Sequence, residues 1–207
     1  MDAVTIINEG GGSAGDDAED RVSAALDAAG IKSAIELVEG RRCAQRAAEI
    51  VTAGASLVIA CGGDGTISAV AGALAGTETK LGVLPLGTLN HFARDLSIPF
   101  DLHEAAEIIA AGHERRVDVA ELNGRPFVNN SAIGLYPQMV LNRDAQRRHL
   151  GRSKWLAVIV ASARTLARFG HQRLRLTVND RPAVADTPLL FVGNNDYQLE
   201  LPNAGSR

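Results

Sequence analysis

Aromatic residues are scarce in this chain of 207 residues, at 4% of the composition, and a net positive charge is absent. The 21 Lys and Arg residues are outnumbered by 24 Asp and Glu residues, which gives a formal net charge of −3. General nucleic-acid binding calls for a basic surface, with aromatic rings for base stacking. We therefore expect no nucleic-acid partner.

Cysteines and long apolar runs are equally sparse. The two cysteines, Cys43 and Cys61, lack metal-ligand spacing and lie among apolar residues, which favours reduced thiols and a cytoplasmic location. No run reaches the length of about 18 apolar residues typical of a membrane span. The first residues do not resemble a secretory leader. With 46% apolar residues, the chain is expected to build a sizeable globular core.

The first half alternates short apolar runs with helical patterns. Predicted strands cover residues 3–7, 34–38, 56–61 and 80–86. Predicted helices cover residues 16–29, 41–53, 66–75, 90–95 and 101–111. This alternation predicts an α/β fold, an open and mostly parallel sheet with helices on both faces.

The pattern changes after Gly112. Alternating runs flank Asn123-Gly124 and Asn179-Asp180, dipeptides that favour tight hairpin turns, and residues 188–194 are a further predicted strand. Helical patterns over 137–149 and 153–169 separate the hairpins. We predict an α/β domain over 1–112. The first portion of a β-rich, sandwich-like domain would then cover 113–207.

Residues 141–175 hold nine basic residues and one acid, Asp144. A solvated helix face is the simpler interpretation of this basic segment. The alternative is contact with an anionic lipid surface, since the pattern over 153–169 places Trp155 and Leu156 on a basic helix. In that case the protein would be peripheral at the inner membrane face.

A first glycine loop, "NEGGGSAG", covers residues 8–15. Gly10, Gly12 and Gly15 fit the G-x-G-x-x-G pattern of dinucleotide-binding folds. In those folds the helix begins within the motif, whereas here four acids lie within residues 16–20. The sequence therefore disfavours a dinucleotide site and leaves two interpretations, a flexible loop near a ligand or a plain loop.

A second glycine loop, "GGDGT" at residues 62–66, follows an apolar strand and precedes a helix. Such loops hold phosphate, because backbone N–H groups and the helix N-terminus favour negative charge. Yet Asp64 stands at the centre of this loop, and no lysine follows it. The plainer interpretation is a strand–helix turn in which Thr66 caps the helix.

A third polar loop, "PLGTLNHFARDLSIP" at residues 85–99, follows the last strand of the predicted sheet. It lies at the same carboxyl edge of the sheet as the GGDGT loop, where open α/β sheets bind ligands. Gly87, Thr88 and Asn90 offer a flexible turn, a hydroxyl and an amide for phosphate or sugar. The plainer interpretation of Asn90 is a cap for a short helix.

Together, Gly62-Gly63-Asp64-Gly65-Thr66 and Gly87-Thr88-Leu89-Asn90, followed by Phe92-Ala93-Arg94, resemble the diacylglycerol kinase catalytic domain family. This family includes bacterial lipid kinases and sphingosine kinases. Residues 117–134 and 191–195 resemble later parts of it. The GGDGT loop is similar to loops of NAD kinases and phosphofructokinases, which implies that residues 1–112 form a nucleotide-binding domain of the phosphofructokinase or NAD kinase type. The Gly-Thr-x-Asn-x-Phe-Ala segment resembles lipid kinases.

The resemblance implies ATP and Mg²⁺ as cofactors and a lipid hydroxyl as the phosphate acceptor. Asp64 would be the catalytic residue and would hold the Mg²⁺–phosphate unit, directly or through water. The implied nucleotide site is made of Asn8, Gly62, Gly63, Asp64, Gly65, Thr66, Gly87, Thr88 and Asn90. The remaining alternatives are an NAD kinase and a non-catalytic nucleotide-binding module.

The sequence also departs from the family. Glu9 replaces the proline of the family's Asn-Pro-x-Ser-Gly loop, and His91 stands where many relatives have Asp. Relatives continue past the position of Arg207, to a downstream Asp-Gly-Glu segment that contributes a carboxylate. We therefore expect the chain as given to transfer little phosphate and to self-associate, with a homodimer as one expected form.

Overall fold

The computed structural model describes residues 3–10, 17–134, 172–178 and 180–194. The chain divides into two compact units. Unit 1 comprises residues 1–129 and 194–207, and unit 2 comprises residues 130–193. Unit 1 contains the predicted sheet and both of the later polar loops, so the candidate site lies within it.

A four-stranded parallel sheet with the order β2-β1-β3-β4 forms the centre of unit 1. Its strands are β1 (Ala3–Asn8), β2 (Ser33–Val38), β3 (Leu57–Gly62) and β4 (Lys80–Pro85). All six residues of β3 are buried, as expected for a strand covered on both faces. Ile7 pairs with Cys61, and Gly62 pairs with Pro85, so three strands end at one edge.

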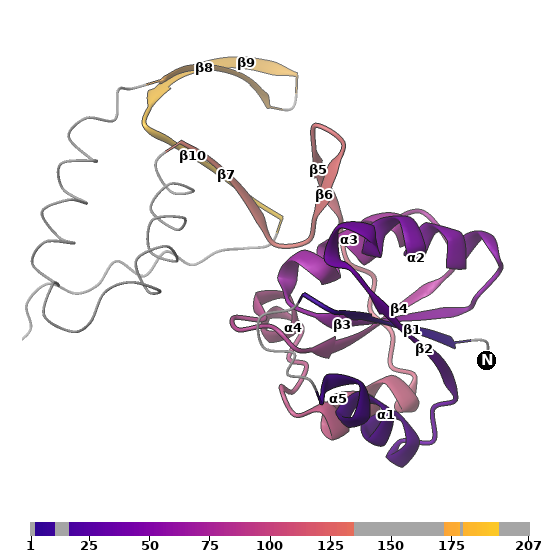
Figure 1. The fold of residues 1–207 in the computed structure, drawn as a ribbon. Helices are drawn as coiled ribbons and strands as arrows, with labels where there is room; N and C mark the ends of the chain where they lie inside the picture. The colour runs from indigo at the N-terminus through magenta and orange to yellow at the C-terminus, as the bar shows by residue number, and fades with distance from the viewer. Residues whose placement is uncertain (1–2, 11–16, 135–171, 179, 195–207) are drawn as a thin grey trace, which may run out of the picture. The chain divides into compact units, whose positions relative to one another are not determined.

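Helices cover both faces of this sheet. They are α1 (Ala18–Ala28), α2 (Cys43–Thr52), α3 (Asp64–Leu74), α4 (His91–Asp95) and α5 (Leu102–Ala111), with a 3₁₀ turn, η1 (Gly40–Arg42), before α2. Helices α2 and α3 lie on one face, and α1 and α5 on the other (Figure 1). Along β3, Ile59 packs in the α1–α5 layer, whereas Val58 and Ala60 pack in the α2–α3 layer. The predicted α/β fold class is confirmed.

Both cysteines are buried in this core and form no disulfide. Burial raises the pKa of the Cys43 thiol and of the Cys61 thiol. Protonated, inaccessible thiols are poor nucleophiles and poor metal ligands, so neither residue is a candidate for chemistry.

A short hairpin follows the last helix. Strands β5 (Ala120–Leu122) and β6 (Arg125–Phe127) pair antiparallel. Asn123 and Gly124 have φ values of 52° and 74°, as the predicted type I′ turn requires. Pro126 packs so closely on Gly72 of α3 that a Cβ at residue 72 would collide with the proline ring. The hairpin thus belongs to unit 1, and the domain boundary near residue 112 stays a prediction.

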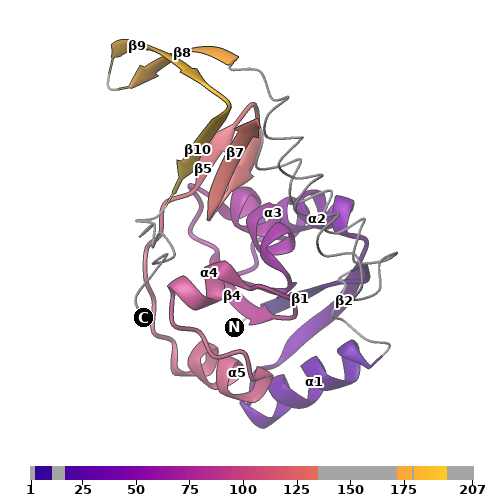
Figure 2. The same ribbon diagram turned by 90° about the vertical axis from the view of Figure 1, so that its left-hand side faces the viewer.

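The described residues of unit 2 form four antiparallel strands in two pairs. They are β7 (Asn130–Gly134), β8 (Gln172–Val178), β9 (Arg181–Thr187) and β10 (Leu189–Gly193). Strand β10 pairs with β7, and β8 pairs with β9 (Figure 2). The predicted helices over 137–149 and 153–169, with most of the basic segment, lie outside the described residues.

We examined the described helices for membrane-spanning character. None of those over residues 3–10, 17–134, 172–178 and 180–194 combines the length and the hydropathy that a membrane span needs.

An ion pair joins α2 to the edge strand β2. Arg46 Nε and Nη2 donate to the two oxygens of Glu36, at 2.6 and 2.7 Å. These hydrogen bonds lower the pKa of Glu36 below its ordinary value of 4.5. The Glu36 and Arg46 side chains are 29% and 38% exposed, so solvent weakens the pair.

We expect Glu36→Gln to lower the free energy of unfolding at pH 7 by about 1 kcal/mol. Because the pKa of Glu36 is lower in the folded chain, its contribution is present above the unfolded pKa. It is lost as the pH falls through the folded pKa, which lies below 4.5, so the difference between the two proteins should shrink as the pH is lowered. Urea unfolding at pH 7 and pH 3 measures this. Glu39→Gln, in the more exposed Glu39–Arg41 pair, is the control, and an equal loss there would contradict the prediction.

Candidate functional site

Asn8, at the end of β1, links the first glycine loop to the second. Its Nδ2 donates to Thr66 Oγ1 at 2.8 Å, and its Oδ1 accepts from Gly10 N at 3.0 Å. Helix α1 begins at Ala18, beyond the last glycine of the G-x-G-x-x-G pattern, as the acidic residues there indicated. Asn8 thus connects two predicted site segments across 58 residues of sequence.

The second and third loops touch through their glycines. A Cβ on Gly63 would lie 3.3 Å from the Gly87 Cα, and a Cβ on Gly87 would collide with the Gly63 backbone. Leu86 N also donates to Gly62 O at 3.0 Å. The two loops that the sequence placed at one sheet edge therefore lie against each other.

Asn90 closes the third loop on itself. Its Oδ1 accepts from Gly87 N and its Nδ2 donates to Gly87 O, both at 2.9 Å. Asn90 is 5% exposed and has a φ of 48°, a left-handed conformation that Asn tolerates better than most residues. Thr88 is exposed in the same turn. Asn90 thus shapes the loop, and Thr88 remains accessible to a ligand.

Asp64 is the first residue of α3, and its carboxylate reaches across to α4. Oδ2 accepts from His91 N at 3.1 Å, and Oδ1 accepts from Phe92 N at 3.0 Å. Oδ1 also accepts from Asn129 Nδ2 at 2.9 Å. Because a helix N-terminus has unpaired N–H groups and a positive dipole end, a carboxylate there is stabilising. Asp64 therefore caps α4 from a different helix.

Two predicted helix caps are wrong, and they have one physical cause. Helix α3 begins at Asp64 after an extended Gly63, so Thr66 lies inside the helix and its hydroxyl accepts from Asn8 instead of capping. Asn90 occupies the N-cap position of α4 but makes no side-chain cap bond, because its amide is engaged by Gly87. In both places the side chain is engaged elsewhere and does not cap, at Thr66 by a residue of another loop and at Asn90 by its own turn.

The geometry around Asp64 limits how a metal fits there. A carboxylate offers about four acceptor positions. The described residues of unit 1 use two on Oδ1 and one on Oδ2, and they leave one on Oδ2. Among the residues that the structure describes, no three His, Cys, Asp or Glu side chains gather into a metal centre. Asp64 thus fits only a metal that brings phosphate and water ligands of its own, as Mg²⁺ does with nucleotides.

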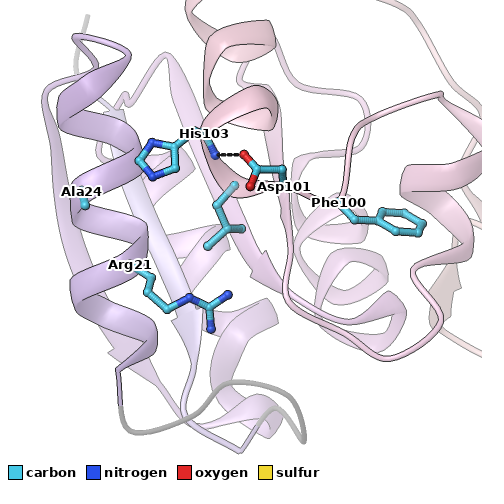
Figure 3. Close-up of a pocket in the computed structure, with 6 residues that line it drawn as sticks. Arg21, Ala24, Phe100, Asp101 and His103 are labelled. Atoms are coloured by element: carbon cyan, nitrogen blue, oxygen red, sulfur yellow. Dashed lines mark hydrogen bonds between the residues drawn. The ribbon is translucent and has the colours of Figure 1, made fainter.

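A cavity of about 210 Å³ lies elsewhere in unit 1, between α1 and the start of α5 (Figure 3). Arg21, Ala24, Phe100, Asp101, Leu102 and His103 line it. The Asp101 carboxylate there accepts from His103 N at 2.9 Å and from Glu104 N, so it caps α5. None of the predicted site residues lines this cavity, which is also smaller than typical ligand pockets of about 300–1,000 Å³.

Sequence reasoning missed Asn129 as a site residue. It is 7% exposed and donates to Asp64 across 65 residues of sequence. The available signal was a polar amide directly after the apolar Val128 at the end of a strand-like run. A buried amide in such a place requires a polar partner, which the sequence alone did not identify.

Comparisons with known proteins agree with this arrangement. The diacylglycerol kinase catalytic domain family matches residues 2–122, more than half of the chain. A diacylglycerol kinase of Staphylococcus aureus is 42% identical over 85 residues, which cover 40% of this chain and 27% of the relative. The chain thus matches about a quarter of the length of that curated relative.

Two solved structures from Bacillus anthracis str. Sterne are also similar. A diacylglycerol kinase aligns with a TM-score of 0.68 and 26% identity, over 95% of this chain and 65% of that one. A putative diacylglycerol kinase aligns with a TM-score of 0.72 and 29% identity, over 95% and 67%. With the family match over residues 2–122, the conclusion is that this chain belongs to the diacylglycerol kinase catalytic domain family.

Proposed function

We propose that the protein is an ATP-dependent lipid kinase. In this reaction a lipid hydroxyl attacks the γ-phosphorus of ATP, the bond to the β–γ bridging oxygen breaks, and ADP and a phosphorylated lipid result with release of one proton. Diacylglycerol or a related lipid is the proposed acceptor. The family match and the similarity of this chain to a diacylglycerol kinase of Staphylococcus aureus support this class of reaction.

The observation that carries the proposal is the contact between the two loops at the carboxyl edge of the sheet. Gly63 and Gly87 approach too closely for side chains, and Asp64 connects the first loop to α4. Phosphoryl transfer depends on positioning and charge neutralisation. A rigid pair of glycine loops with one carboxylate suits a phosphate chain that carries a metal.

The residues would then have distinct roles. The backbone of Gly62, Gly63 and Gly65 would lie against the nucleotide, and Thr88 would donate a hydrogen bond to a phosphate oxygen. Mg²⁺ bound with ATP would neutralise phosphate charge, and Asp64 Oδ2 would accept from its hydration shell or bind it directly. The side chains of Asn8, Thr66 and Asn90 would keep the loops in shape, because their described hydrogen bonds go to other residues of these loops. The membrane surface and the homodimer stay predictions.

The test offers two acceptors in one assay. Transfer of labelled phosphate from Mg²⁺-ATP is measured with diacylglycerol in mixed micelles and, in parallel, with NAD. Label in the lipid above background, at the low level expected for the chain as given, is the expected result. This label should be lost in Asp64→Asn and kept in Asp101→Asn. Label in NAD alone would establish the NAD kinase alternative. ATP binding with no transfer to either acceptor would overturn the proposal in favour of a non-catalytic nucleotide-binding module.

A further inference from the structure

Asn129 is a buried amide with only one of its two polar atoms hydrogen-bonded. Nδ2 donates to Asp64 Oδ1 at 2.9 Å. Within the described residues, Asn129 Oδ1 is a buried side-chain oxygen that accepts no hydrogen bond. Such an oxygen costs free energy, because folding removes it from water without replacing its partner. An apolar side chain at this position would avoid the cost.

The orientation of this amide follows from the charge on Asp64. Rotating the amide by 180° would place Oδ1 against the carboxylate oxygen, and two acceptors would then face each other. The carboxylate thus holds the amide in the orientation that leaves Oδ1 without a partner. The benefit that offsets this cost lies in the bond to Asp64.

That bond completes the coordination of one carboxylate oxygen. Oδ1 already accepts from Phe92 N, and with Asn129 both of its acceptor positions are filled. Among the described residues, Oδ2 accepts from His91 N alone. The carboxylate is therefore fixed in rotation, and its remaining acceptor position is confined to Oδ2.

We propose that Asn129 is a positioning residue, which saturates Asp64 Oδ1 and so presents Oδ2 to metal-bound nucleotide. The inference rests on the proposed function, because it assigns Asp64 to Mg²⁺-ATP. Asn129 acts through Asp64 and touches no nucleotide itself. Partners that orient a metal-binding carboxylate commonly change metal affinity by about tenfold or more when they are removed.

The backbone of Asn129 is held separately, which provides a matched control. Asn194 N donates to Asn129 O at 2.7 Å. The Asn194 side chain donates to Asp118 O at 2.7 Å and to Val128 O at 3.2 Å. Asn194→Ala thus removes the side-chain hydrogen bonds to Asp118 O and Val128 O, beside Asn129, and keeps the bond between Asn129 and Asp64.

The experiment is a double-mutant cycle on nucleotide affinity. Dissociation constants of Mg²⁺-ATP and metal-free ATP are measured by calorimetry for the wild type, Asn129→Leu, Asp64→Asn and the double variant. We expect Asn129→Leu to weaken Mg²⁺-ATP about tenfold relative to metal-free ATP. The quantity compared is the ratio of the Mg²⁺-ATP dissociation constant to the metal-free ATP dissociation constant. Asn129→Leu should leave this ratio unchanged when Asp64→Asn is also present. Asn194→Ala, as a single substitution, should leave the ratio at its wild-type value.

The outcomes separate this inference from the proposed function. A ratio that changes equally in both backgrounds, or that changes in Asn194→Ala, would overturn the positioning role, because Asn129 would then act through general structure. A ratio that changes in Asp64→Asn but not in Asn129→Leu would overturn the positioning role and leave the proposed function intact. Equal binding of both nucleotide forms by every protein would overturn both. Thermal unfolding is measured first, and Asn129→Ala takes the place of Asn129→Leu if leucine does not fit.

Discussion

Asp64→Asn is expected to weaken Mg²⁺-ATP binding about 10- to 100-fold more than it weakens metal-free ATP binding. Asp64 begins α3, and its carboxylate accepts hydrogen bonds from His91 N and Phe92 N of α4. Among the described residues, its Oδ2 has one acceptor position left. Asparagine keeps the shape of the side chain but removes the charge that favours a cation. Titration calorimetry with and without Mg²⁺ measures the two affinities.

The same substitution should also lower the free energy of unfolding, by on the order of 1–3 kcal/mol. In either orientation an asparagine amide at position 64 points its N–H₂ at a backbone N–H of His91 or Phe92. Lost activity in this variant is therefore no proof of a metal role, whereas a changed Mg²⁺ preference is. Asp101→Asn is the control, because Asp101 also caps a helix and asparagine caps about as well. An equal loss for both nucleotide forms would remove the metal role from Asp64.

Gly87→Ala is expected to lower the free energy of unfolding by about 1–3 kcal/mol and to weaken ATP binding at least tenfold. A Cβ at this position would lie 2.5 Å from Asn90 Oδ1 and collide with the Gly63 Cα. The neighbouring atom is backbone and cannot rotate away, so the two loops must separate. Urea unfolding and ATP titration measure the two effects.

Gly65→Ala is the matched control for the unfolding part of this prediction. It lies in the same pair of loops, yet nothing stands within 4 Å of its added Cβ. As an exposed helical position, residue 65 should gain up to about 1 kcal/mol from alanine. If both variants unfolded at the same urea concentration as the wild type, the close packing of Gly63 on Gly87 would be contradicted.

Much of unit 1 could be predicted because its signals are local. The apolar run at 56–61 predicted β3, and the helical pattern over 101–111 predicted α5. The glycine loops could be assigned to one sheet edge, because parallel strands place their carboxyl ends together. Each of these inferences needed only neighbouring residues and the regularity of the fold.

The hydrogen bonds inside the site could not be predicted in the same way. Asp64 caps a helix that begins 27 residues later, so the pattern around residue 64 carries no sign of it. Asn90 carries a common capping side chain but uses it within its own turn. Both errors arise because one side chain can satisfy several donors, and only the packed loops decide which.

The two connections between the units, at Asn129 and Asn194, also impose an order on biosynthesis. Residues up to Asn129 leave the ribosome with every strand and helix of the parallel sheet already made. Asn194 hydrogen-bonds to residues made 66 and 76 positions earlier, so these bonds close only after the intervening strands exist. At about 5–20 residues per second, the delay is roughly 3–15 s. We therefore expect the parallel sheet to fold first in the nascent chain. The hydrogen bonds of Asn194 to Asp118, Val128 and Asn129 would form last.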